Sequence, residues 1–328
     1  MKGIKSIIVV AVVLITVVGI IIGVKGGDRL GEEDFVVVTN FPAYDFVRAV
    51  VGDKIDIKML MKPGVEIHDF EPTPQDIIDI KNSKAFVYTG GESDEWIEDV
   101  LNNVEVDEKK LIKMMDIVQV VEEEIVEGME NDYWGENVGS DGYVESASAS
   151  ENAEYDEHIW TSIKNAIKIV NDIKNRFIMI FPEHKVIFEQ NTEEYINRLS
   201  VLDQEFKKLI EESNRKTIVF GDRFPLRYFV DDYGLDYFAV FSGCSEQTEA
   251  SSKTISFLVN KIKTEKIPVV FKIEMSDGKI ANTIAKETGT EVLEFHSAHN
   301  VSVEDFESGV TYADIMERNL KVLEVALR

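Results

Sequence analysis

The chain has 328 residues, of which 44% are hydrophobic, and a formal net charge of −26 at pH 7. A charge of this sign argues against binding to nucleic acid and against docking on an anionic lipid surface, because both would repel the protein. The length allows one large core or two ordinary ones, and the only cysteine, Cys244, excludes an internal disulfide, so stability has to come from the core.

Residues 1–33 are predicted to form an N-terminal signal or anchor followed by a linker. Lys2 and Lys5 precede an apolar run over residues 7–24. That run is long for a signal-peptide core and slightly short for a spanning helix. No A-x-A-like cleavage site follows, which favours an uncleaved anchor over a removed signal. Basic residues before the run and acidic ones after it predict an extracytoplasmic, cell-surface protein, either tethered or secreted after cleavage.

From residue 34 onward, strand-like and helix-like segments alternate, which indicates βαβ units and parallel sheets. Apolar or β-branched runs predict strands over residues 35–39, 55–61, 85–89 and 110–114, and again over 217–220, 237–241, 269–273 and 291–295. Helical patterns cover residues 43–51 and 75–81. In the second of these, Pro72 and Pro74 lie at the helix start, where a missing amide donor is tolerated.

The stretch 182–214 has no glycine, and its apolar residues recur at alternating four- and three-residue steps. One stripe on one long helix explains that spacing. Its members are Tyr195, Leu199, Leu202, Phe206 and Leu209. The predicted fold class is therefore α/β, with two parallel-sheet lobes joined by one long helix. We expect an N-terminal lobe over residues 34–182, the linking helix over 183–214 and a C-terminal lobe over 215–328.

An acidic insertion interrupts the first lobe at residues 121–157. It carries no lysine or arginine, and none occurs between Lys113 and Lys164. This composition predicts a mobile surface loop, and a tether without a specific role explains it equally well.

Three of the four histidine-bearing segments point to a shared metal site. His68, in PGVEIHDFEPTPQD, follows the predicted strand 55–61, and His158, in YDEHIW, precedes a helical pattern. His296 and His299 follow the predicted strand 291–295, whereas His184 lies on a polar helix start with no such context. Loops at the carboxyl ends of strands are favourable positions for ligands. A scatter of unrelated histidines is the alternative.

Several motifs in order along residues 34–327 resemble one family, the metal-specific solute-binding proteins of zinc and manganese ABC transporters. The motifs are TNFPAYDFVRAVVGD (39–53), PGVEIHDFEPTPQD (63–76), VYTGGESDEWIEDVL (87–101), YDEHIWTS (155–162), and YFVDDYGL (228–235). The resemblance implies two α/β lobes bridged by a rigid helix, with the metal in the cleft between them. It also implies an ABC permease as partner, a monomer, and no enzymatic activity.

The resemblance further implies four metal ligands from four places. His68 and His158 match the first two, and His296 occupies the fourth, with His299 three residues further on. The third position falls on Arg223, whose guanidinium stays protonated and cannot bind a cation. The nearest ligand-capable group is Asp222, which is equally explained as a loop cap or as the partner of Arg223.

Other residues remain open for the incomplete shell. The alternative candidate ligands are His299 and also Cys244 and Glu246, which lie on a further loop that follows a strand. Three histidines and one carboxylate favour Zn(II), and binding should weaken as pH falls through the histidine range. The alternatives are a manganese-binding protein and a surface adhesin stapled by its metal. A metallohydrolase is disfavoured, because the sequence has no HExxH, serine nucleophile elbow or phosphate-binding glycine loop.

Overall fold

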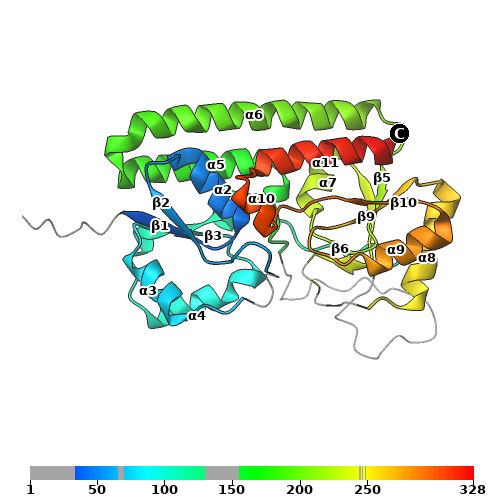
Figure 1. Cartoon of the computed structure of the whole chain (residues 1–328), viewed down its shortest axis with the longest axis horizontal. Helices are drawn as coiled ribbons and strands as arrows, with labels where there is room; N and C mark the ends of the chain where they lie inside the picture. Colours follow the sequence, from blue (N-terminus) through cyan, green and yellow to red (C-terminus); the bar gives the residue numbers. More distant parts are fainter. Residues whose placement is uncertain (1–33, 66–69, 130–154, 244, 246, 248) are drawn as a thin grey trace, which may run out of the picture.

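The computed structural model describes residues 34–65, 70–129, 155–243, 245, 247 and 249–328. Two α/β lobes lie side by side beneath a layer of long helices (Figure 1). The first lobe holds a four-stranded parallel sheet in the order β2-β1-β3-β4. Its strands are β1 Phe35–Val38, β2 Asp56–Met59, β3 Ala85–Tyr88 and β4 Leu111–Lys113. All four strands predicted for this lobe are confirmed. They could be recognised in the sequence because each has several apolar residues.

Two α-helices of the first lobe begin at capping side chains. Asn40 accepts a hydrogen bond from Ala43 N (3.2 Å) at the start of α2, Phe41–Val51. Thr73 and Asp76 form a reciprocal capping box at the start of α3, Pro74–Asn82, which confirms the predicted helix there. The remaining elements are η1 Glu92–Asp94, α4 Glu95–Asn103, η2 Glu108–Lys110 and η3 Met114–Ile117.

The second lobe is built from short parallel strand pairs. Its strands are β5 Thr217–Val219, β6 Arg223–Phe224, β7 Asp236–Phe238, β8 Phe241–Ser242, β9 Val269–Lys272 and β10 Glu291–Glu294. β5 pairs with β7, β9 with β10 and β6 with β8, and a parallel bridge between Phe220 and Phe271 joins the first two pairs. The predicted strand 237–241 is divided into β7 and β8, and β6 has only two residues, too few for a recognisable pattern. The helices are α7 Arg227–Tyr233, α8 Ser252–Glu265, α9 Lys279–Thr288 and α10 Val303–Glu307.

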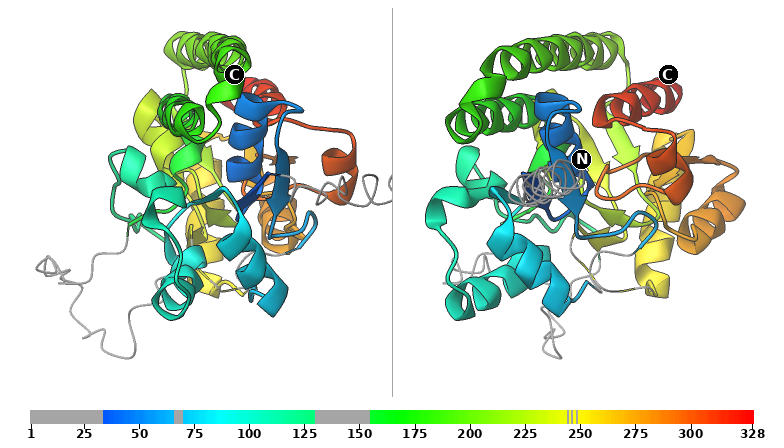
Figure 2. Two further views of the ribbon diagram at one scale, coloured as in Figure 1. Left: turned by 90° about the vertical axis from the view of Figure 1, so that its left-hand side faces the viewer. Right: turned by 60° about the vertical axis from the view of Figure 1, so that its left-hand side comes forward.

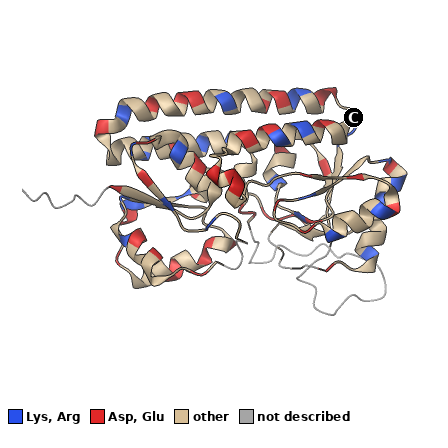
Figure 3. Cartoon of the chain, in the orientation of Figure 1, with Lys and Arg blue, Asp and Glu red and all other residues tan. Residues whose placement is uncertain are grey.

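A helical layer spans both lobes. It consists of η4 Ile159–Thr161, α5 Ile163–Ile180, η5 Pro182–His184, α6 Lys185–Glu212 and α11 Tyr312–Leu327. The long linking helix is confirmed as α6, with a 3₁₀ turn at its start (Figures 1 and 2). Both acidic and basic residues are distributed along its ribbon (Figure 3). Of the predicted stripe, Leu199, Leu202 and Phe206 are buried. Tyr195 is less buried and donates to Asp45 Oδ2 (2.6 Å).

One hydrophobic core runs through both lobes and the helical layer. It contains Phe46 of α2, Ile169 of α5, Phe206 of α6, Phe229 of α7 and Leu323 of α11. Burial of apolar surface therefore fixes both lobes on the same helices. In the described part of the chain, no helix is long and apolar enough to cross a membrane. The predicted anchor in residues 1–33 lies outside the described residues.

The ends of the acidic insertion lie together. Glu122 and Tyr155 form an antiparallel bridge, and Asp156 N donates to Val121 O (2.9 Å). Residues 130–154 lie outside the described residues. The insertion therefore leaves and rejoins the fold at one point, directly before His158.

Candidate metal centre

His158 is the best-defined of the predicted ligands. Its side chain is 1% exposed and lies just before η4. One carboxylate oxygen, Asp156 Oδ1, accepts from His158 N (2.7 Å) and lies 3.1 Å from ring atom Nδ1. This contact holds the ring and occupies Nδ1, so Nε2 is the nitrogen available to a metal.

The neighbouring Glu157 is also buried, and its carboxylate is held in place. Its Oε2 accepts from Ser93 N (2.9 Å), and its Oε1 accepts from the Ser93 hydroxyl. Gly91 lies against it, and a Cβ there would be 2.2 Å from Glu157 Cβ. The VYTGGESDEW motif thus has a physical role, because glycine and serine receive the Glu157 side chain.

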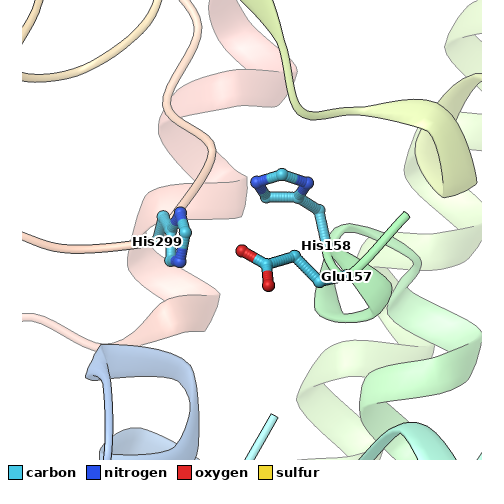
Figure 4. Close-up of side chains that lie close together, drawn as sticks. All are labelled: Glu157, His158 and His299. Carbon is cyan, nitrogen blue, oxygen red and sulfur yellow. The ribbon is translucent and has the colours of Figure 1, made fainter. Parts of the chain in front are cut away.

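His299 reaches the same point from the second lobe. Its backbone N–H donates to Glu274 Oε1 and to Ser297 Oγ, both at 3.2 Å. Its ring lies 5.1 Å from the His158 ring and 4.9 Å from the Trp160 ring, measured between centroids. Ligand atoms of Glu157, His158 and His299 all lie within 4.8 Å of one another (Figure 4). Two imidazoles and a carboxylate at this spacing fit a divalent transition metal.

His296 takes a different role in the same loop. Its Nδ1 accepts from Ala298 N (2.9 Å) and lies 3.5 Å from Glu274 Oε2, and its backbone N–H donates to Asn319 Oδ1 (2.9 Å). Ala298 has a positive φ of 62°, so the chain turns sharply between the two histidines. Among the described residues, the structure groups His299, and not His296, with His158.

Asp222 is likewise absent from the group of ligand atoms found among the described residues. Its Oδ1 accepts from Arg223 N (2.9 Å), which is the loop-cap role given as an alternative above. Its Oδ2 is buried without a hydrogen-bond partner. Burial raises the pKa of this carboxyl, although the Arg223 backbone N–H, the neighbouring Ser276 and the Arg223 charge oppose the rise.

A cavity of about 30 Å³ lies between the lobes at this point. His158, His299, Glu274, Arg223 and Asn300 contribute to its lining. It is Arg223, rather than Asp222, that reaches this cavity. A water molecule needs about 10–15 Å³ on this measure, so the cavity has room for two or three water-sized groups.

The remaining predicted ligands lie outside the described residues, namely His68, Cys244 and Glu246. Val65, three residues before His68, lines the cavity. Asn300, next to His299, donates through Nδ2 to Lys62 O (3.0 Å) and Val65 O (2.8 Å). Gly64 N donates to Val301 O (2.8 Å). The loop after β10 is therefore tied to the segment that leads to His68.

Carboxylates around His158 set its protonation. Burial alone lowers the pKa of the His158 imidazole, but Asp156, Glu157 and Glu123 outweigh it and raise the pKa above the ordinary 6.5. A proton therefore competes with a metal for this ring at a higher pH than for an exposed histidine.

Sequence reasoning missed two residues of this site. Glu157 directly precedes the predicted ligand His158 in YDEHIW, and it is its neighbour Asp156 that contacts the His158 ring. Glu274 was not predicted either, although an acidic residue directly after the predicted strand 269–273 was a signal for it. Its carboxylate accepts from Ser297 N (2.7 Å), Ser297 Oγ (2.5 Å) and His299 N.

The chain matches one protein family over residues 36–326, described as "Zinc-uptake complex component A periplasmic", ZnuA. The zinc-binding lipoprotein AdcA of Streptococcus pneumoniae is 28% identical over 289 residues, which cover 88% of this chain and 55% of that protein. The chain thus spans about half the length of AdcA. The high-affinity zinc uptake system protein ZnuA of Bacillus subtilis is 27% identical over 300 residues, covering 92% and 89% of the two chains.

Solved structures agree with the sequence matches. The Zn(II)-bound ZnuA-like domain of S. pneumoniae AdcA superposes with a TM-score of 0.71 and 26% identity, covering 90% of this chain and 99% of that one. The metal-dependent lipoprotein YcdH of B. subtilis gives 0.72 and 26%, covering 90% and 100%. Fold, sequence and the shared match over nearly the whole described region lead to one conclusion: the chain belongs to the ZnuA family of periplasmic zinc-uptake components.

Proposed function

We propose that this protein captures Zn(II) outside the cytoplasm and delivers it to an ABC permease. The observation that carries the proposal is that ligand atoms of His158, His299 and Glu157 lie within 4.8 Å of one another, and that both histidines line the cavity between the lobes. Imidazole donors favour zinc over manganese, which prefers shells of oxygen ligands. The family is a component of an uptake complex and not an enzyme family, so the site serves binding and release.

The ligand set that we propose is His68, His158 and His299, with a fourth position beside them. The grouping of His299 with His158 supports His299 over His296, and the hydrogen bonding of Asp222 to the Arg223 backbone supports a structural role for Asp222. Glu157 is the carboxylate within reach of the fourth position. We further propose that residues 1–33 tether the protein to the membrane and that it acts as a monomer.

A pair of variants tests the ligand set. His299→Ala removes a ligand and should lower zinc affinity by well over tenfold. The loss of a ligand should exceed the roughly 10–100-fold effect of losing a residue that only orients a ligand. His296→Asn is the matched control, because asparagine keeps an acceptor for Ala298 N, and its affinity should stay within a few-fold of wild type. Competition with a chelator of known affinity measures both. A larger loss in His296→Asn than in His299→Ala would transfer the ligand role from His299 to His296.

His68→Ala completes the test, and it should also lose more than about tenfold in affinity. A wild-type chain that binds no zinc under any condition would refute the function itself. Unchanged affinity in His68→Ala would instead limit the protein ligands to those grouped in the cavity.

A further inference from the structure

His158 lies in a stretch of chain that one helix of the second lobe holds on both sides of the histidine. Tyr228 of α7 donates through its hydroxyl to Asp156 O (2.7 Å), two residues before His158. Asp232, one turn further along α7, accepts from the Ser162 hydroxyl (2.6 Å), four residues after His158. Residues four apart lie on the same face of a helix, so one face of α7 holds this stretch at two points.

The helix itself is fixed in the core. Phe229, the residue after Tyr228, is fully buried, and its ring centroid lies 5.2 Å from that of Phe206 in α6 and 5.3 Å from that of Phe295. α7 belongs to the motif YFVDDYGL (228–235), and no residue of this motif lines the cavity. Any influence of the motif on the metal therefore has to pass through the residues that it holds.

The Tyr228 hydroxyl also joins the two ends of the acidic insertion. It accepts from Val121 N (3.2 Å) while it donates to Asp156 O, and Asp156 N donates to Val121 O (2.9 Å). A phenol hydroxyl has one hydrogen to donate and lone pairs that accept, so both of its functions are in use here. The backbone of Asp156 is thereby fixed through its N–H and through its carbonyl.

The position of Asp156 is important because its carboxylate holds His158. Its Oδ1 accepts from His158 N (2.7 Å) and lies 3.1 Å from the ring atom Nδ1. A carboxylate at Nδ1 fixes the orientation of the ring and leaves Nε2 for the metal. A displacement of the Asp156 backbone would therefore be transmitted to the nitrogen that binds the ion.

We propose that Tyr228 is a positioning residue for zinc binding, which acts on the ligand His158 through Asp156. This inference rests on the proposed function, because it requires His158 to bind the metal. Tyr228→Phe removes only the hydroxyl. It should lower zinc affinity by about tenfold, the lower end of the roughly 10–100-fold effect of losing a residue that orients a ligand. Chelator competition measures the affinity, and urea unfolding measures the stability.

Tyr233→Phe is the matched control. Tyr233 lies on the same helix and is also buried, and the substitution again removes one hydrogen bond, from the Tyr233 hydroxyl to Asp203 Oδ1 (3.1 Å). Asp203 lies on α6 and does not line the cavity. The control variant should therefore lose stability and keep the zinc affinity of the wild type.

Two further readouts separate positioning from a loss of stability. Asp156→Ala lacks the carboxylate that transmits the effect, so adding Tyr228→Phe to it should lower zinc affinity by less than about twofold more, whereas independent effects would multiply. The visible spectrum of bound Co(II) depends on ligand geometry. It should change in Tyr228→Phe and stay unchanged in Tyr233→Phe, and this readout holds even where Asp156→Ala does not fold.

Each contrary outcome has a definite meaning. Wild-type affinity and an unchanged Co(II) spectrum in Tyr228→Phe overturn this inference and leave the proposed function standing. Equal losses of affinity in Tyr228→Phe and Tyr233→Phe overturn it as well, because they show a general effect of destabilisation. A further loss of about tenfold when Tyr228→Phe is added to Asp156→Ala overturns the route through Asp156. A wild-type chain that binds no zinc refutes the proposed function itself.

Discussion

Glu274 lies behind the proposed ligand His299, and removing its carboxylate should damage both stability and metal binding. The side chain is buried, at the carboxyl end of β9, and it joins that strand to the loop after β10. In Glu274→Ala, Ser297 N and Ser297 Oγ lose their acceptor, while His299 N keeps the Ser297 hydroxyl oxygen. Each buried donor without a partner costs about 1–3 kcal/mol, so unfolding should become easier by about 2–6 kcal/mol.

Zinc affinity should fall by about 10–100-fold in the same variant, the range for groups that orient a ligand. Glu274→Gln separates the two effects of the side chain. Its carbonyl can accept from Ser297 N, and its amide can donate to Ser297 Oγ, so we expect a loss of less than about 1.5 kcal/mol and less than tenfold in affinity. Urea unfolding measures stability, and chelator competition measures affinity.

An exposed carboxylate one strand away provides the control. Glu294 pairs with Lys272 (2.9 Å) at the surface, and Glu294→Ala should cost at most about 1 kcal/mol with unchanged zinc affinity. The reasoning fails if Glu274→Ala binds zinc as well as the wild type, or if it behaves no differently from Glu294→Ala.

Three further outcomes are expected. Since carboxylates raise the pKa of His158, protonation stabilises the metal-free fold below pH 6.5, and that contribution is lost as pH rises through the raised pKa. Zinc affinity should change in the opposite direction and fall as the pH falls. A titration in which zinc affinity stays constant down to about pH 6 would contradict this. Burial raises the pKa of Asp94 to about 7, so the native state keeps a proton that the unfolded state releases from pH 3.8 upward, and stability falls across that window. Asp94→Asn should remove this loss, so its free energy of unfolding in urea should gain up to about 4 kcal/mol relative to wild type between pH 4 and pH 8. The variant should fold, because the backbone donors Thr89 N and Gly90 N both bind one oxygen, which asparagine retains. Equal pH profiles of the variant and the wild type would refute this. Deleting residues 130–153 should leave zinc affinity by chelator competition unchanged, because Glu122 and Tyr155 already close the base of the insertion; a lost site would mean that the insertion supplies a ligand.

Much of the fold was predictable because its signals are local. The strands of the first lobe, α3 with its Thr73 cap, and α6 with its apolar stripe all depend on residues close in sequence. The second lobe was harder, since β6 and β8 have two residues each and carry no periodicity. Their pairing depends on contacts between distant segments, which no short pattern encodes.

The same distinction between local signals and contacts of distant segments applies to the site. His158 was predictable from its place before a helix, and the structure brings it into the ligand group. The position of His299, rather than His296, beside His158 was not predictable, because it depends on the turn at Ala298, whose positive φ is unusual for a residue with a side chain. The role of Glu274 could not be predicted for a different reason, since its hydrogen-bond partners lie 23 and 25 positions further along the chain.

The neighbour of His299 gives the site a mechanical property. Asn300 holds the backbone of Lys62 and Val65 from across the cleft, and Val301 O accepts from Gly64 N beside it. A force that draws the lobes apart is therefore applied to the same short loop that carries a proposed ligand. Separation would pull His299 out of line with His158 before the rest of either lobe deformed. The residence time of the bound ion would then be governed by how often these three hydrogen bonds break together. A partner that breaks them on binding would release the ion without contacting it.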